Sequence, residues 1–417
     1  MQRYDSYKDS GIQWLGEIPS HWEVCKIKNV SQISSGSTPK SSIEKYWGGG
    51  IKWITPADFK TDTKYVCKGM RNITEVGALS CSTKLIPKNS VVFSKRAPVG
   101  QVSITTDDLC INQGCIACIP NESIITPFFF YLLSCYKDEF ESLSGGTTFK
   151  EIALNVFADF KISIPPLPEQ QAIASYLDTA TAKIDEAIAQ QQKMIDLLNE
   201  RKQIIINNAV TKGLNPNAKM KPSGIDWIGN IPEHWELKQY RHLFYNLDYL
   251  RQPITADERS RNNPQFDYYG ASGIIDKIDY YNVDDKVLLI GEDGANLLMR
   301  NLPLIYKAEG KFWVNNHAHI LKPIQDDYDF MAYVMEAADY TLFITGSAQP
   351  KLSQSNLNAV KLPIPPIEEQ QSIVKYLEQR TGKIDISISN TTKQIALLQE
   401  RKQIIINDVV TGKVKVV

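Results

Sequence analysis

A long internal repeat constrains the fold of this chain more than any other feature of its sequence. Residues 164–213 and 364–413 align without a gap at an offset of 200 residues, and 28 of the 50 aligned positions are identical. A shorter motif precedes each copy, because residues 10–23 (SGIQWLGEIPSHWE) return as residues 223–236 (SGIDWIGNIPEHWE). Two copies are too few for a solenoid. The pattern therefore predicts one large unit that is present twice.

The long repeat has the composition and periodicity of a helix. Pro165-Pro166 can precede a helix but cannot lie inside one. From Leu167 to Asn207 there is no glycine, and the only proline, Pro168, falls in the first turn, where it is tolerated. Both copies show the same spacing of four and three residues: Leu177, Thr181, Ile184, Ile188, Gln191, Ile195, Leu198, Lys202, Ile205, and Leu377, Thr381, Ile384, Ile388, Thr391, Ile395, Leu398, Lys402, Ile405. Two long helices with matching seams predict a coiled-coil pair. The alternative is a plain amphipathic helix on a globular core.

The variable regions 24–163 and 237–363 have the pattern of β-rich domains. Short β-branched and apolar runs, such as 91–93 and 287–290, are bounded by Gly, Asp and Pro. The two regions barely resemble each other. Similar repeats that carry different inserts indicate two recognition surfaces with different targets.

Charge is distributed unevenly along the chain. The net charge is −1, but residues 26–96 contain 13 Lys and Arg against four acidic residues, a local charge of +9. A basic region of this size is typical of phosphate contacts in DNA binding. A solvated lysine-rich surface is the alternative interpretation.

The cysteines and the apolar runs limit where the protein works. Six of the seven cysteines lie between Cys67 and Cys135, and the second half has none. Cys115 and Cys118 lack a second ligand pair at zinc spacing, so buried structural thiols are expected. No run of 18 apolar residues and no signal peptide are found, which predicts a cytoplasmic protein.

Two motifs, each present twice, carry a family resemblance. The first is Ser-Gly-Ile-x-Trp-(Leu/Ile)-Gly-x-Ile-Pro-x-His-Trp-Glu. The second is Pro-Pro-x-x-Glu-Gln-Gln leading into a long helix that closes on Glu-Arg-Lys-Gln. Through both motifs the chain resembles the specificity subunits of Type I restriction–modification systems over nearly its whole length. Segments 35–39, 53–58 and 310–319 also look like parts of that family's target-recognition domains.

The resemblance implies an α+β fold: two β-rich target-recognition domains joined by two long antiparallel coiled-coil helices, with an internal pseudo-twofold repeat. The implied segments are a first recognition domain at 1–163 with its motif at 7–23, a helical spacer at 164–213, a second recognition domain at 214–363 with its motif at 220–236, and a second spacer at 364–417.

The resemblance also implies partners. The chain would read a bipartite target in double-stranded DNA, one half-site per domain. It would bind two methyltransferase subunits, which use S-adenosylmethionine to methylate adenine, and motor-nuclease subunits, which use ATP and Mg²⁺. No cofactor is expected in this chain itself. Two alternatives are the recognition subunit of a related bipartite, Type IIB-like system, and a coiled-coil scaffold without a role on DNA.

The sequence lacks the catalytic motifs of enzymes that modify or translocate DNA. A complete Asn/Asp-Pro-Pro-aromatic segment for a flipped base is missing, as is a G-x-x-x-x-G-K-[ST] loop for ATP. The chain is therefore expected not to be an enzyme. His317 and His319 would share one face of a strand, so a metal-dependent nuclease is a further alternative, with carboxylates from Asp284, Asp285, Glu292 and Asp293. His21 and His234, in the short motif, are expected to hold its packing.

Candidate DNA contacts follow from side-chain chemistry. Arg and Lys pair with guanine or phosphate, and Asn and Gln pair with adenine. In the first variable region the candidates are Lys40, Lys52, Lys95, Arg96, Gln101, Asn112, Gln113 and Lys150. In the second they are Lys311, Asn315, Asn316, His317, Gln349 and Lys351. A solvent-facing or structural role is the alternative for each of them.

Overall fold

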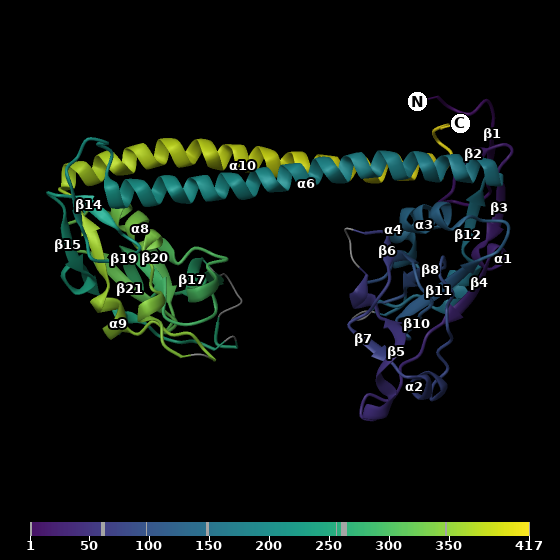
Figure 1. Cartoon of the computed structure of the whole chain (residues 1–417), viewed down its shortest axis with the longest axis horizontal. Helices are drawn as coiled ribbons and strands as arrows, with labels where there is room; N and C mark the ends of the chain where they lie inside the picture. Colours follow the sequence, from purple (N-terminus) through teal and green to yellow (C-terminus); the bar gives the residue numbers. More distant parts are fainter. Residues whose placement is uncertain are drawn as a thin grey trace. The chain divides into compact units, whose positions relative to one another are not determined.

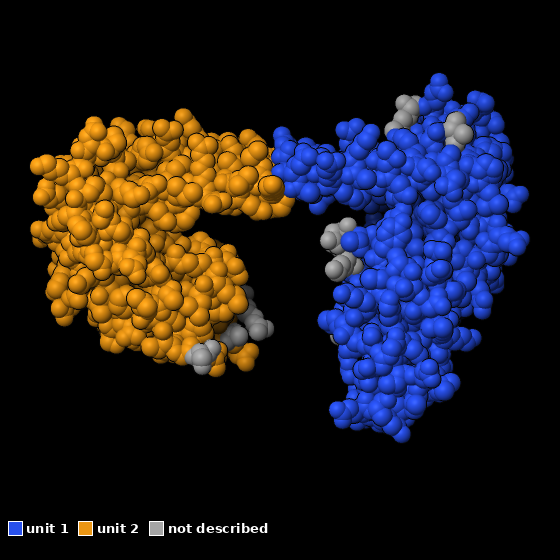
Figure 2. All heavy atoms as spheres, in the orientation of Figure 1, with its two compact units in different colours: residues 1–191, 393–417 blue, residues 192–392 orange. Residues whose placement is uncertain are grey.

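The chain divides into two compact units, coloured separately in Figure 2. The computed structural model describes residues 2–59, 63–96, 98–146, 150–255, 257–259, 265–346 and 348–416. The first unit comprises residues 1–191 and 393–417, and the second comprises residues 192–392. Each unit therefore combines one variable region with part of both long helices.

The first unit is built from short strands and short helices (Figure 1). Its elements outside the long helices are β1 (Tyr7–Asp9), β2 (Glu17–Pro19), β3 (Glu23–Lys26), α1 (Ile27–Val30), β4 (Ser31–Ser35), η1 (Glu44–Tyr46), β5 (Trp47–Ile54), η2 (Pro56–Asp58), β6 (Tyr65–Val66), β7 (Arg71–Ile73), α2 (Glu75–Leu79), β8 (Val91–Ser94), β9 (Val102–Thr105), β10 (Cys110–Ile111), β11 (Cys115–Pro120), α3 (Thr126–Cys135), α4 (Lys137–Ser142), α5 (Leu154–Asp159) and β12 (Lys161–Ile164).

The second unit has a related order of elements, in which β19 and β20 are the longest strands. Its elements are β13 (Met220–Pro222), β14 (Asn230–Pro232), β15 (Glu236–Gln239), η3 (Tyr240–His242), β16 (Phe244–Asn246), η4 (Asp248–Leu250), β17 (Phe266–Gly270), β18 (Gly273–Ile278), β19 (Val283–Gly291), α7 (Asn296–Met299), β20 (Ile305–Val314), β21 (Ala318–Pro323), α8 (Tyr328–Ala337), η5 (Thr341–Phe343), α9 (Gln354–Ala359) and β22 (Lys361–Ile364).

The strand topology of the two units corresponds. In the first unit one sheet has the order β4-β11-β8-β9-β6, and β10-β5-β7 forms a second sheet. In the second unit the corresponding strands form one six-stranded sheet with the order β16-β21-β19-β20-β17-β18. The long strand β20 occupies the place of both β9 and β10, which residues 106–109 separate in the first unit. One parallel pair, β10 with β5 in the first unit and β20 with β17 in the second, lies at the same place in both, and the first unit has a further parallel pair, β6 with β9.

Two long helices, α6 (Leu167–Lys212) and α10 (Ile367–Val410), each continue from one unit into the other. In the first unit Lys402 Nζ lies 2.7 Å from Asp185 Oδ1. In the second unit the equivalent pair, Lys202 Nζ and Asp385 Oδ1, lies 2.6 Å apart. The beginning of each helix thus packs on the end of the other, so the pair is antiparallel.

The seam predicted from the sequence is confirmed. All the seam residues named from Leu177 to Ile205 and from Leu377 to Ile405 are buried or half-buried. The helix ends also join the cores. Val210 and Leu377 lie in the core of the second unit, and Leu177 and Val410 lie in that of the first. Helix pairing and domain packing therefore use one continuous apolar face.

The short repeated motif forms hydrogen bonds with a glutamate near the start of each long helix. In the first unit Glu169 accepts hydrogen bonds from Tyr4 Oη at 2.6 Å and from Trp22 Nε1 at 3.1 Å, and its Oε2 lies 2.8 Å from His21 Nε2. The second unit repeats the His234 and Trp235 contacts on Glu369, at 2.8 and 3.1 Å. The expectation that both histidines hold the packing of the motif agrees with this geometry.

The cysteines take different environments. All seven are free, and Cys110, Cys115 and Cys118 are buried. Burial raises the pKa of Cys118 to about 12, so it stays a neutral thiol. The expectation of buried thiols for Cys115 and Cys118 is confirmed, whereas Cys67, outside that cluster, is exposed. Within the described part of the chain, every helix is too short or too polar to cross a membrane.

Candidate nucleic-acid interface

Three chain segments cross at the end of β8 in the first unit. Residues 95 and 96 leave the strand, and the Lys95 amide donates to the carbonyl of Gly114 at 2.9 Å. The returning segment joins from the other side, since the Ile152 amide donates to the Lys95 carbonyl at 3.0 Å. The Asn112 side chain closes the turn before β11 by accepting from the Gly114 amide at 2.8 Å. Such a turn is typical of Asn.

The second unit contains the same crossing at the end of β19. The Glu292 amide donates to the His317 carbonyl at 2.8 Å, and the Leu352 amide donates to the Glu292 carbonyl at 2.7 Å. Asn315 accepts from the His317 amide at 2.8 Å, as Asn112 does in its own turn. We call these crossings the strand-end sites: residues 95–96, 112–114, 145–146 and 150–152 in the first unit, and 292–293, 315–317, 345–346 and 348–352 in the second.

The two strand-end sites hold the same ion pair with exchanged signs. In the first, Lys95 Nζ lies 2.8 Å and Arg96 Nη1 lies 3.4 Å from the carboxylate of Glu151. In the second, the strand supplies the acid and the returning segment supplies the base, because Lys351 Nζ lies 3.1 Å from Glu292 Oε1. The hydrogen bond from Lys95 holds the pKa of Glu151 below its usual value. Both carboxylates are therefore charged at neutral pH.

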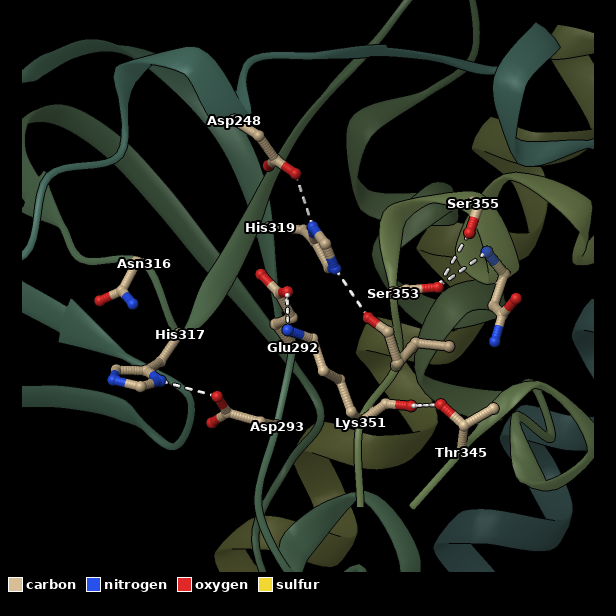
Figure 3. Close-up of polar contacts among 12 residues, drawn as sticks. Asp248, Glu292, Asp293, Asn316, His317, His319, Thr345, Lys351, Ser353 and Ser355 are labelled. Atoms are coloured by element: carbon tan, nitrogen blue, oxygen red, sulfur yellow. Dashed lines mark hydrogen bonds and ion pairs between the residues drawn. The ribbon is translucent and has the colours of Figure 1, made fainter. Parts of the chain in front are cut away.

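A buried polar network supports the second strand-end site (Figure 3). His319 is fully buried, with Nδ1 2.6 Å from Asp248 Oδ2 and Nε2 2.8 Å from the carbonyl oxygen of Leu352. Arg251 lies between Asp248 and Glu292 and contacts both carboxylates. Burial alone would raise the pKa of Asp248 and of Glu292. The hydrogen bonds from His319 and Arg251 nevertheless hold both values below the usual range.

This geometry corrects the prediction that His317 and His319 share a strand face. Strand β21 begins at Ala318, so His317 lies in the preceding turn, where Nδ1 is 2.7 Å from Asp293 Oδ2. Figure 3 shows the two rings pointing to different partners. Both ring nitrogens of His319 are already hydrogen-bonded, and none of the described residues form a group of three or more His, Cys, Asp or Glu suited to a metal.

The structure brings most of the predicted DNA contacts together. Around the first strand-end site lie Lys95, Arg96, Gln101, Asn112, Gln113 and Lys150. Around the second lie Asn315, Asn316, His317, Gln349 and Lys351. Three candidates lie elsewhere: exposed Lys40, Lys52, and Lys311. Lys52 pairs with Asp107 at 2.8 Å, and Lys311 Nζ lies 4.7 Å from the ring centroid of Tyr281. All fourteen remain predictions as DNA contacts.

One exposed cation, Arg71, was not predicted from the sequence. Its guanidinium carbon lies 3.7 Å from the ring centroid of Trp47, on the sheet β10-β5-β7. The sequence did contain a signal for an unusual conformation at Trp47. The run Gly48-Gly49-Gly50 follows it, and a glycine run inside a strand indicates a bulge.

A protein-family model described as Type I restriction modification DNA specificity domain matches residues 19–195 and again residues 232–397. The two matches cover most of the chain, which belongs to this family. Its function is therefore DNA sequence specificity in Type I restriction–modification. The Type IIB-like and nuclease alternatives are not favoured.

Individual relatives agree. The Type I restriction enzyme MjaIX specificity subunit of Methanocaldococcus jannaschii is 26% identical, over 96% of this chain and 95% of that protein. The EcoprrI specificity subunit of Escherichia coli is 23% identical, over 89% and 90%. A chain from a structural study of complex assembly and conformational transition of the type I R-M system aligns with a TM-score of 0.70 and 16% identity, over 95% of this chain and 99% of that one. The predicted α+β fold is confirmed.

Proposed function

We propose that each unit reads one half of a bipartite target in double-stranded DNA. The observation that supports this is the strand-end site, which occurs twice on the same scaffold with different side chains. Lys95, Arg96 and Gln113 surround the first, whereas Asn316, His317 and Lys351 surround the second. Base recognition depends on which donors and acceptors reach the base edges. Two copies of one frame with different donors suit two different half-sites.

Two methyltransferase subunits are the partners that the helix pair suits best. In the second unit, Leu197 and Ile204 of α6 are about half exposed, at 51% and 52%. In the first unit, Leu397 and Ile404 of α10 occupy the equivalent positions and are 64% and 51% exposed. An apolar pair on a helix surface is typical of a protein contact, and its presence once per unit fits one partner copy on each. Motor-nuclease subunits would complete the complex.

The chemistry would then reside in the partners. The methyltransferase subunits would hold S-adenosylmethionine, and the motor-nuclease subunits would hold ATP and Mg²⁺. This chain would carry no cofactor and would not be an enzyme. The seven free thiols suit the reducing cytoplasm, where DNA and these partners are found.

The test is reconstitution. The chain alone should neither methylate nor cleave DNA, and adenine methylation at one bipartite motif should appear when a cognate methyltransferase subunit and S-adenosylmethionine are added. Methylome sequencing of the reconstituted host reads the motif directly. Robust methylation or cleavage by the chain alone would contradict the proposal, as would methylation without a two-part motif.

A domain exchange tests the assignment of one half-site to each unit. Replacing residues 24–163 by the equivalent region of another family member should change one half of the motif and leave the other intact. The reciprocal exchange of residues 237–363 is the matched control and should change the other half. A change in both halves, or in neither, would contradict the assignment.

A further inference from the structure

Strand β5 of the first unit contains a wide bulge that aims Trp47 at its neighbour strand. Trp47 and Ile51 both pair with Ile73 of β7, so Gly48 to Gly50 loop out between them. Gly48 has φ +79°, which favours glycine. A Cβ on Gly49 would lie 2.5 Å from the carbonyl oxygen of Ile73, so only glycine fits there. Bulges often re-aim a side chain next to a functional site.

The bulge places the Trp47 ring under the guanidinium of Arg71. Trp47 is held from two directions: its Nε1 donates to the Lys40 carbonyl at 3.3 Å, and its ring meets Trp53 edge-on at 5.2 Å between centroids. Arg71 is exposed, yet its guanidinium carbon stacks 3.7 Å from the Trp47 centroid. Stacking fixes the plane of the guanidinium while its N–H groups stay available at the edge.

The charge of Arg71 is not neutralised by an ion pair among the described residues, unlike that of a second stacked arginine, which lies in the other unit at a different position in the fold. There, Arg259 also lies on an aromatic ring, 4.4 Å from the centroid of Tyr268, but its Nη1 is 3.0 Å from Asp276. Asp276 pairs with Tyr268 across the sheet as Arg71 pairs with Trp53. No ion pair formed by the described residues includes Arg71.

Arg71 lines a concave surface of the first unit. The cavity, of about 730 Å³, is lined by Glu44, Lys52, Lys68 and Asn72 together with Trp47 and Arg71. Lys68 adds a second positive charge, Glu44 adds one negative charge, and Asn72 adds an amide donor and acceptor, whereas Lys52 is already paired with Asp107 at 2.8 Å. This combination favours a ligand with negative charge and hydrogen-bonding edges, which fits the major groove of DNA.

We propose that Arg71 reads a guanine in the half-site recognised by the first unit, held in plane by Trp47. The proposal rests on the proposed function. A planar guanidinium forms two parallel hydrogen bonds with guanine O6 and N7, the commonest specific contact in the major groove. Stacking on Trp47 restricts the guanidinium to one plane with its N–H edge free, which is the geometry that a base edge requires.

Arg71→Lys is the main test, because it keeps the positive charge and removes the two-pronged geometry. The variant, expressed with its methyltransferase partner, should lose preference for guanine at one position of the first half-site, by about 5- to 140-fold. The rest of that half-site and the whole second half-site should stay unchanged. Trp47→Leu should relax the same position by a smaller factor. Arg259→Lys is the matched control and should leave the motif unaltered.

Binding to a synthetic duplex carrying the wild-type motif, measured against salt concentration, separates a base contact from a phosphate contact. A phosphate contact predicts that Arg71→Gln weakens binding to all sequences equally and reduces the salt slope by about one. That result, an unchanged motif in Arg71→Lys, or relaxation in the second half-site would overturn the proposal. Thermal melting shows whether Trp47→Leu still folds. If Trp47→Leu does not fold, Arg71→Lys alone decides the test. If the wild-type complex itself shows no two-part motif, the proposed function has failed instead.

Discussion

Replacing His319 by alanine should destabilise the second unit strongly, although His319 touches no proposed ligand. Its ring is fully buried and joins Asp248 to the Leu352 carbonyl. Removing one partner of a buried ion pair typically costs about 3–5 kcal/mol. Asp248 would keep the Ile320 amide at 2.8 Å and Arg251 at 3.4 Å. We therefore expect the lower end, about 3 kcal/mol of unfolding free energy.

His317 offers a matched control two residues away. Its ring is 46% exposed and meets Asp293 at 2.7 Å, so His317→Ala should cost less than about 1 kcal/mol. Hydrogen–deuterium exchange of the β21 amides measures the effect within the second unit. His319→Ala should speed their exchange by about 100-fold, which corresponds to about 3 kcal/mol, and His317→Ala should speed it several-fold at most. Equal effects of the two substitutions would refute the reasoning, as would an unchanged rate in His319→Ala.

Three further predictions test other parts of the structure. Lys95→Glu should weaken the first strand-end site by about 1 kcal/mol, and the double variant with Glu151→Lys, which copies the signs of the second site, should recover most of the loss in urea unfolding. Leu197→Asp and Leu397→Asp should each remove one methyltransferase copy and give a one-to-one complex by light scattering. The double variant should bind neither copy. Because the folded-state pKa of Asp248 is lowered, its stabilising contribution is complete above about pH 4. It should be lost as the pH falls further, and the acid dependence of urea unfolding should therefore flatten in His319→Ala.

The features that sequence predicted are those encoded locally. The helix seam follows from a spacing of four and three residues, and it appears twice, so Leu177 and Leu377 could be placed on it from their spacing alone. The short motif could be recognised because it also appears twice. Its contact with Glu169, which lies more than a hundred residues away, could be identified only from the fold. Candidates such as Lys95 and Asn112 could be chosen from their side-chain chemistry, and their gathering at one site was not predicted.

The features that sequence did not predict depend on which segments meet. Nothing near Glu151 in the chain indicates that it faces Lys95, or that Lys351 faces Glu292. His317 and His319 appeared equivalent because the start of β21 falls between them, and that boundary depends on the turn closed by Asn315. The stacking of Arg71 requires the register of β5 on β7, which the bulge shifts.

The exchanged signs of the two strand-end sites bear on how a duplicated chain folds correctly. A protein with two similar halves risks docking a returning segment on the wrong half, as duplicated and repeat proteins do when they misassemble. Here such a swap would set Glu151 against Glu292 and Lys351 against Lys95. Like charges in contact oppose the wrong arrangement while opposite charges favour the right one. The exchanged signs thus favour docking of each returning segment on its own half and disfavour docking on the other half.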